Sequence, residues 1–258
     1  MARIHHTATV EPGARLADDV EVGPYSLVGP DVELAPGVVV GSHAAIIGRT
    51  QIGDRTRVYS FAAIGGEPQD TAHDGEATRL EIGRDNVIRE HVTIHVGTSR
   101  GGGCTRIGDE TFIMNSAHIG HDCRIGSQCI IASFSGLAGH VTVGDFAVLG
   151  AYTGVHQFAR VGESVMAAAN TKLSQDAPPF ALVAGDRARL VGLNSIGLKR
   201  REFTQDSIRA LKRAFHFIFQ SRLRLQDALA RTREELGESP EVARLLTFLE
   251  KSERGFCR

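Results

Sequence analysis

Aliphatic residues recur at every sixth position along about two thirds of the chain. The series runs from Ile4 to Ile64, returns at Ile82, Ile88 and Ile94, slips by one position, and resumes from Ile107 to Val161. A glycine often follows the aliphatic residue directly, as at Gly120 and Gly126. A period of six fits neither an amphipathic helix nor an alternating strand. It predicts a parallel β-helix in which three hexads form a triangular coil of about 18 residues, with coils stacked about 4.8 Å apart and a glycine-tolerant corner in each hexad.

Two segments interrupt the period and are expected to be excursions from the prism, at about 65–81 and 97–105. In the first, the inward positions hold Asp70 and Glu76; the second reads GTSRGGGCT. Such segments are either tolerated surface insertions or loops that contact a substrate or a neighbouring subunit. The hexad repeat, together with these two excursions, assigns residues 1–190 to the β-helix domain.

Residues 191–258 are assigned to a C-terminal helical domain. Pro178 and Pro179 are expected to stop the strand ladder. Apolar residues then recur at helical spacing; one helix is expected to end at Gly237, and another to begin with Ser239 as N-cap and Pro240 at N1. From 196 onward the chain holds 14 Lys/Arg against 9 Asp/Glu, which suits an acidic partner or a solvated helix face equally well.

Composition excludes several classes of protein. The formal net charge is −1, so no nucleic acid is expected as a partner. The four cysteines form no CxxC pair, and no secretory leader is evident, which together favour a reducing, cytoplasmic location. No apolar run approaches the ~18 residues of a membrane span, so no stable membrane insertion is expected.

Stacking by 18 residues gathers polar side chains at one corner of the predicted prism. His121 lies one coil from Gly139 and two from Gln157, Asp122 lies one coil from His140, and His118 and His156 are close by. Three interpretations compete. The histidines are hydrogen-bonded corner residues; or His118, His121, His140 and His156 bind zinc; or a histidine oriented by Asp122 removes a proton while the Gly139 N–H stabilises an oxyanion.

Six stretches narrow the choice: AHIGHDCRIG, LAGHVTVGDFAVLG, GVHQF, IREHVTIHVGT, GEPQD and NSIGLKRR. Together they resemble the UDP-N-acetylglucosamine O-acyltransferases of lipid A biosynthesis, within the hexapeptide-repeat acyltransferases, and the resemblance covers essentially the whole chain. It implies a mainly β fold, a left-handed parallel β-helix with a C-terminal α-helical domain, in a homotrimer with active sites between prisms. It also implies transfer of a β-hydroxyacyl chain from acidic acyl carrier protein to the sugar 3-hydroxyl. No cofactor or metal is expected beyond the carrier's own phosphopantetheine.

The resemblance also implies roles for individual residues. His121 matches the general base, Asp122 the residue that supports its imidazole, and Gly139 the glycine whose N–H faces the thioester oxygen. The matching pocket residues are His95, His118, His140, His156 and Gln157. Gln69 and Asp70 match sugar and pantetheine contacts that reach in from the neighbouring subunit. Asn194, Arg200 and Arg201 match the uridine-diphosphate end. Ala169, with Met166, matches the residues that measure acyl length.

The match departs from the family at two places, both at the acceptor end. Ala72 and His73 stand where a lysine and a tyrosine are usual after the QD pair, and Ile196 stands where a carboxylate is usual. These departures raise the hypothesis that the acceptor is a 3-amino nucleotide sugar. Two alternatives of other classes also remain at this point: a zinc-dependent lyase of the carbonic anhydrase type, and a non-enzymatic trimeric scaffold.

Overall fold

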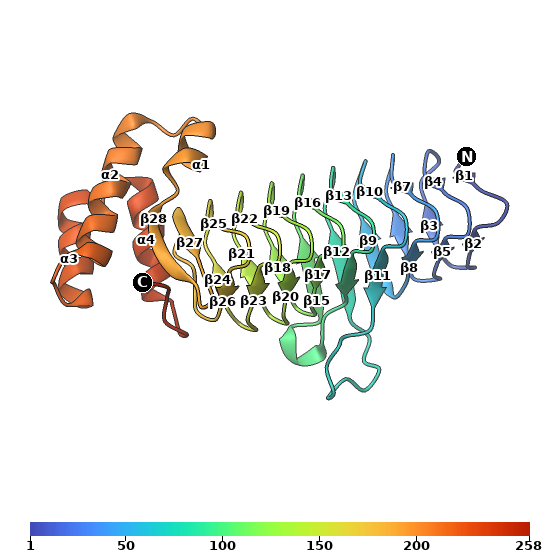
Figure 1. Cartoon of the computed structure of the whole chain (residues 1–258). Coiled ribbons are helices and arrows are strands. Elements are labelled where there is room, and N and C mark those ends of the chain that lie inside the picture. Colours follow the sequence, from blue (N-terminus) through green and yellow to red (C-terminus); the bar gives the residue numbers. More distant parts are fainter.

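The computed structural model describes all 258 residues as a long three-faced prism with helices at one end (Figure 1). The faces are three sheets, here called A, B and C. Strands from successive coils pair in parallel, as when Ile119 of one coil lies against Leu137 of the next. The structure thus confirms the 18-residue coil that the hexads predict.

Each face is one sheet to which the coils contribute one strand each, and face A ends in one further, antiparallel strand. Face A contains β1 (Arg3–Ile4), β4 (Glu21–Val22), β7 (Val39–Val40), β10 (Arg57–Val58), β13 (Val87–Ile88), β16 (Phe112–Ile113), β19 (Ile130–Ile131), β22 (Val148–Leu149), β25 (Met166–Ala167), β27 (Ala181–Ala184) and β28 (Arg189–Leu193). Face B contains β2 (Thr9–Val10), β5 (Leu27–Val28), β8 (Ala45–Ile46), β11 (Ala63–Gly66), β14 (Thr93–His95), β17 (His118–Ile119), β20 (Gly136–Leu137), β23 (Gly154–Val155) and β26 (Lys172–Leu173). Face C contains β3 (Arg15–Leu16), β6 (Glu33–Leu34), β9 (Arg49–Ile52), β12 (Arg79–Ile82), β15 (Cys104–Ile107), β18 (Arg124–Ile125), β21 (Thr142–Val143) and β24 (Arg160–Val161).

The three edges of the prism, called AB, BC and CA after the faces that they join, are tight turns. From Glu110 to Asn170 every sixth residue has a positive φ, and none of these eleven residues is glycine. Asp122 and His140 are two of them, with φ of 59° and 62°. The glycines lie at the expected corner, but not at the position with positive φ. They are required because the next coil packs closely against them: a Cβ on Gly126 would lie 2.7 Å from the Asp145 nitrogen.

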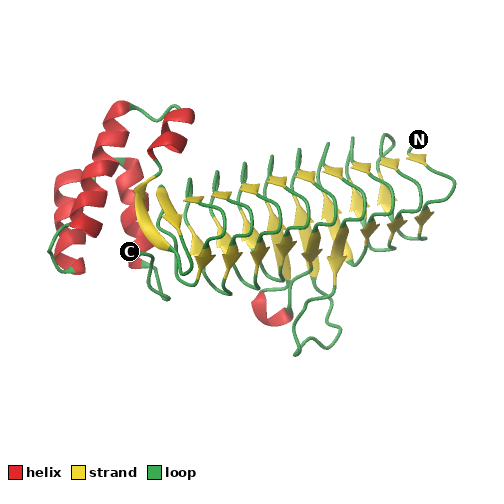
Figure 2. Ribbon diagram, in the orientation of Figure 1, coloured by secondary structure: helices red, strands yellow, loops and turns green.

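Both excursions leave the prism at edge BC (Figures 1 and 2). They are shorter than predicted, since the strands extend into them: the first spans 67–78, and the second spans 96–103 and includes the 3₁₀ turn η1 (Ser99–Gly101). They replace the BC corner in two successive coils, and the coil that follows carries His121. Loop backbone is therefore placed directly over the polar cluster.

The C-terminal part departs from the prediction at two points. β27 follows Pro178 and Pro179 yet pairs in parallel with β25, so the prolines do not stop the ladder. The predicted domain boundary at 190/191 falls inside β28, which pairs antiparallel with β27. The prolines are tolerated because they occupy the turn before the strand, where no ladder N–H is needed.

The helices are α1 (Ser195–Arg200), α2 (Gln205–Phe215), the π-helical turn η2 (His216–Gln220), α3 (Leu225–Leu236) and α4 (Pro240–Glu250). The predicted cap of α4 is confirmed: the Ser239 side chain accepts a hydrogen bond from the Val242 N–H, and Pro240 is the first helical residue. α3 ends before Gly237, as predicted, although Gly237 keeps a right-handed φ of −65°. None of the helices combines the length and apolar character needed to cross a lipid bilayer.

Candidate active site

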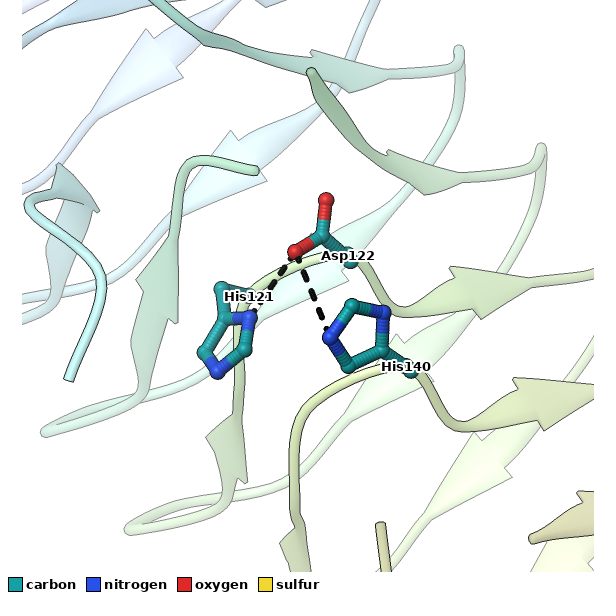
Figure 3. A group of neighbouring side chains, drawn as sticks. All are labelled: His121, Asp122 and His140. Carbon is teal, nitrogen blue, oxygen red and sulfur yellow. Dashed lines mark hydrogen bonds and ion pairs between the residues drawn. The ribbon is translucent and has the colours of Figure 1, made fainter. Parts of the chain in front are cut away.

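His121 and Asp122 form a hydrogen-bonded pair at edge BC, between β17 and β18 (Figure 3). His121 Nδ1 lies 2.8 Å from Asp122 Oδ2. The other ring nitrogen, Nε2, has no hydrogen-bond partner within the chain, and His121 lines a cleft. A neutral imidazole that donates through Nδ1 to a carboxylate keeps a lone pair on Nε2. The arrangement is that of a general base with an orienting partner.

The Asp122 carboxylate is fully buried and accepts hydrogen bonds from three groups. Its side chain has 0% exposure. The Thr98 backbone N–H and hydroxyl both donate to it, in addition to His121. His140 Nε2 approaches the same Oδ2 at 3.8 Å. A buried carboxylate with this many donors is compensated for the water that it has lost.

Gly139 lies against the face of the His121 ring. A Cβ at this position would be 2.5 Å from both Cε1 and Nε2 of His121. The Gly139 N–H takes part in no hydrogen bond within the chain, and it sits at the corner where His121 Nε2 opens into the cleft. A free N–H beside a free imidazole nitrogen can stabilise negative charge on an oxygen that the base has helped to form.

The cleft runs along face B beside this corner and has a volume of about 890 Å³. Six of its lining residues were predicted from the sequence: Gln69, His118, His121, Gly139, His156 and Gln157. Its C-terminal end is lined by residues that sequence reasoning missed: Lys172, Ser174, Asp186, Arg187 and Arg254. Lys172 was detectable, since stacking by 18 residues puts it in register with Gly154.

Arg254 could not have been found from the repeat, because it comes from the C-terminal tail. Its guanidinium donates to the Ser174 carbonyl at 3.4 Å and lies 3.3 Å from His156 Nδ1. The tail is held there by Asp176, which is 1% exposed and accepts a hydrogen bond from the Ser252 hydroxyl at 2.8 Å. A long-range clamp thus places a cation at one end of the cleft.

The other predicted pocket histidines surround the pair. His118 Nδ1 lies 2.8 Å from the Thr93 hydroxyl, and burial lowers the pKa of His118, with the nearby His95 and His121 adding to the effect. Burial also lowers the pKa of His140, against the opposing charge of Asp122. His95 contacts the Glu67 carbonyl through Nδ1, and its buried Nε2 has no partner. His118 and His140 are therefore held neutral around pH 7.

Three ligand atoms, one each from His121, Asp122 and His140, lie within 4.8 Å of one another and could in principle hold a metal ion. Both Asp122 oxygens already accept hydrogen bonds from Thr98, however, and His121 Nδ1 is directed at the same carboxylate. Two imidazoles remain, which is fewer than the three protein ligands typical of catalytic zinc. Within this group of three the hydrogen bonds already made favour a hydrogen-bonded pair, and the expectation that no metal is bound stays a prediction.

Comparisons with known proteins identify the family of the chain. The family model for UDP N-acetylglucosamine O-acyltransferase domain 2 matches residues 176–257, and the bacterial transferase hexapeptide model matches 104–139. The acyl-[acyl-carrier-protein]–UDP-N-acetylglucosamine O-acyltransferase of Myxococcus xanthus is 47% identical over 258 residues, covering 100% of both chains. The chain belongs to this acyltransferase family.

Solved structures of the acyltransferase family share the architecture. UDP-N-acetylglucosamine acyltransferase from Campylobacter jejuni has a TM-score of 0.94 and 41% identity, covering 99% of both chains. The enzyme from Moraxella catarrhalis has a TM-score of 0.95 and 36% identity, again with 99% of both chains covered. The predicted fold class, a left-handed parallel β-helix with a C-terminal helical domain, is confirmed.

The residues predicted for the uridine-diphosphate end of the acyltransferase lie on another edge of the prism. Asn194 caps α1, accepting from the Gly197 N–H and donating to the Ser164 carbonyl, each at 3.0 Å. The Arg201 guanidinium lies 3.3 Å from the centre of the Phe146 ring. Phe146 and Ser164 belong to edge CA, and Arg200, also in α1, is exposed. A single chain does not bring these residues to His121.

Four further predicted residues take distinct positions. Gln69 lines the cleft of its own chain, and its expected contact from a neighbouring subunit stays a prediction. Asp70 does not line the cleft; its carboxylate accepts from the Ala72 N–H, although its charge acts on His140. Ala169 is exposed on edge AB, and Met166 is half-buried on face A. The acyl-length role of Ala169 and Met166 stays a prediction.

Proposed function

We propose that this protein transfers a β-hydroxyacyl chain from acyl carrier protein to the 3-hydroxyl of UDP-N-acetylglucosamine, the first step of lipid A biosynthesis, with His121 as the general base. One observation carries the proposal: a chain of this family holds His121 Nδ1 on a buried carboxylate and leaves Nε2 free in a cleft beside the Gly139 N–H. The curated relatives are named acyl-[acyl-carrier-protein]–UDP-N-acetylglucosamine O-acyltransferases, which supports the donor and the acceptor.

The chemistry needs no enzyme nucleophile. His121 Nε2 takes the proton of the sugar hydroxyl as its oxygen attacks the thioester carbonyl carbon, and the Gly139 N–H hydrogen-bonds to the resulting oxyanion. The tetrahedral intermediate collapses, the carbon–sulfur bond breaks, and the proton on His121 passes to the departing thiolate. Removing a general base of this kind costs about 10²–10⁴ in rate.

The basic end of the cleft supports a donor carried on phosphopantetheine. Lys172, Arg187 and Arg254 line this end, and Asp186 is the single acid among the cleft residues there. The phosphate that joins pantetheine to its carrier is an anion of the right class, and the carrier itself is acidic. Arg254→Ala is therefore expected to raise KM for the acyl carrier substrate more than it lowers kcat.

The separation of the predicted residues supports a homotrimer with sites shared between subunits. The base lies at edge BC, whereas Arg200 and Arg201 lie beside edge CA of the same chain. Edge AB, moreover, carries a row of exposed aromatic residues: Tyr25, Phe61, Phe134 and Tyr152 are 49–63% exposed. A second copy of the chain would cover this row. The expected solution mass is three times 27.7 kDa, measured by light scattering.

The four cysteines support the proposed cytoplasmic location. All are buried and unpaired. Free thiols persist in the reducing environment of the cytoplasm.

Acyl transfer from β-hydroxyacyl carrier proteins of several chain lengths tests the proposal. Wild type is compared with His121→Ala and with His6→Ala, an exposed histidine far from the cleft, and metal content is measured on each preparation. Loss of about two or more orders of magnitude for His121→Ala alone is expected. Stoichiometric zinc without product would favour the zinc-dependent lyase. Product formation by His121→Ala at the wild-type rate would refute the role of His121 as general base.

The 3-amino nucleotide sugar remains the alternative acceptor. His73 does not line the cleft, and its Nδ1 lies 2.9 Å from Glu76. Within the chain it therefore does not take the place of the lysine that is usual in the family after the QD pair. Ile196 is 68% exposed on α1. Assaying both acceptors side by side decides the matter: preference for the ordinary sugar excludes the amino-sugar hypothesis.

A further inference from the structure

We propose that the second excursion, residues 96–103, is a positioning element for the base, in which Thr98 holds Asp122 and thereby fixes the protonation pattern of His121. The inference rests on the proposed function, because a positioned base is meaningful only where His121 removes a proton. It assigns a role to a loop that the hexad repeat leaves unexplained.

The Thr98 contacts converge on one carboxylate. Its backbone N–H donates to Asp122 Oδ1 at 2.9 Å, and its hydroxyl donates to Oδ2 at 2.6 Å. His121 Nδ1 lies 2.8 Å from the same Oδ2. An ionised carboxylate only accepts, so the proton of a neutral His121 stays on Nδ1 and the lone pair on Nε2. The Asp122 N–H in turn donates to Thr105, which holds the backbone at this corner.

The hydroxyl of Thr98 is fully engaged. It accepts a hydrogen bond from the Gly101 N–H at 3.1 Å while it donates to Asp122. The residue is 2% exposed, so water cannot take its place. A series of hydrogen bonds thus connects the loop backbone to the base, through Gly101, Thr98, Asp122 and His121. Each donor in this series has one acceptor available to it.

The loop backbone packs directly on the carboxylate. A Cβ on Gly101 would lie 2.0 Å from Asp122 Cγ and 2.3 Å from both carboxylate oxygens. Gly101 does not have a positive φ, so its backbone conformation does not require glycine. Close approach to Asp122 is the reason that remains.

The first excursion braces the second. Glu76 accepts from both the Ser99 N–H and the Ser99 hydroxyl at 3.2 Å. The hydrogen bond from the Asp74 backbone, and to a lesser extent the one from the Ser99 backbone, holds the pKa of Glu76 well below its usual range. The Glu76 carboxylate is therefore ionised around pH 7. It joins the loop that carries Gln69 to the loop that holds Asp122.

Other charged groups near the pair are few. His140 Nε2 lies 3.8 Å from Asp122 Oδ2, and His118 lies close enough for the charge of His121 to lower its pKa. Asp70 acts on His140, and the Arg124 guanidinium lies beside Gly102. None of these groups donates a hydrogen bond to Asp122, so the Thr98 hydroxyl is the contact to remove.

The test compares Thr98→Val with Thr98→Ser and with a matched control, Thr78→Val. Thr78 lies in the first excursion, is 7% exposed, and its hydroxyl has no hydrogen-bond partner. Steady-state acyl transfer is measured across the pH range together with thermal unfolding. Thr98→Val is expected to lower kcat about tenfold with little change in KM, Thr98→Ser to restore it, and Thr78→Val to match wild type.

The pH profile separates positioning from mere support of the loop. In the proposed mechanism the acidic limb of kcat/KM reports protonation of the base, and a carboxylate with one donor fewer stabilises the protonated imidazole more strongly, so the limb moves to higher pH in Thr98→Val and returns in Thr98→Ser. A folded Thr98→Val enzyme with wild-type kcat and an unmoved limb overturns the inference. If Thr98→Val does not fold, Thr98→Ser and Gly101→Ala are compared instead, with loss of activity expected in Gly101→Ala alone.

A second readout does not depend on turnover. The ¹⁵N chemical shifts of the His121 ring are expected to show the Nδ1–H form in wild type and in Thr98→Ser, and a mixture of forms in Thr98→Val. Wild type that transfers no acyl chain but shows this pattern would refute the proposed function, while the control of the His121 ring by Thr98 would stand as a structural fact without a catalytic role. Identical ring shifts in all three proteins would refute the positioning role even where acyl transfer is found.

Discussion

Gly139→Ala is expected to abolish most of the activity by pushing the base out of place. The added Cβ would lie 2.5 Å from Cε1 and Nε2 of His121 and 3.1 Å from Nδ1. Carbon atoms in contact sit about 3.5–4.0 Å apart, so the ring must retreat by about 1 Å. Such a retreat strains the 2.8 Å contact with Asp122 and moves Nε2 away from the attacking hydroxyl.

The magnitude follows from the displacement. A misplacement of about 1 Å at a reacting group costs about 10²-fold in rate, or about 2.7 kcal/mol of transition-state stabilisation. Gly139 does not have a positive φ, so alanine fits the backbone. The three atoms nearest to the new Cβ all belong to the His121 ring. The loss of folding stability, about 1–3 kcal/mol for overpacking, should therefore come from this one contact.

The assay is a double-mutant cycle. Turnover and urea unfolding are measured for wild type, Gly139→Ala, His121→Ala and the double variant. In the His121→Ala background, Gly139→Ala should cost no stability, since the ring it collides with is absent. Gly136→Ala is the control for stability, because nothing lies within 4 Å of its new Cβ. Turnover within about threefold of wild type for Gly139→Ala, or the same destabilisation in both backgrounds, would refute the reasoning.

Three further predictions concern protonation, the core and the acyl chain. Burial lowers the pKa of His118 and His140, so below about pH 6.5 the unfolded chain binds more protons than the folded chain. The free energy of unfolding should therefore fall as the pH falls through this range. His118→Gln should make its dependence on pH less steep, as measured by urea unfolding at several pH values. Ile119→Ala, at a side chain with 0% exposure, should cost about 2–5 kcal/mol in the same assay, and a loss below about 1 kcal/mol would contradict the packing. Ala169→Met should shift preference toward shorter acyl chains and Ala169→Gly should not; competition between chain lengths checks both, and unchanged preference in both variants would refute the acyl-length role.

The sequence alone predicted the prism and the arrangement of the pair at its edge. In a stacked coil, neighbours in space are separated by a constant number of residues, so His121, Gly139 and Gln157 could be placed together by counting. The same rule placed Asp122 beside His140. It also located the glycines, although the left-handed corner positions are filled by other residues and close packing is what requires glycine.

Counting stops where the repeat stops, and there only the tertiary structure decides. Thr98 lies 24 residues before Asp122, and Arg254 lies 98 residues after His156; no period relates the members of either pair. The prolines did not end the ladder, and β28 crosses the predicted domain boundary. Loops and tails are placed by the hydrogen bonds that their own backbones must satisfy against whatever surface they meet. For this protein the repeat determines where His121 stands, and non-repeating segments determine what holds it and what lines the rest of its cleft.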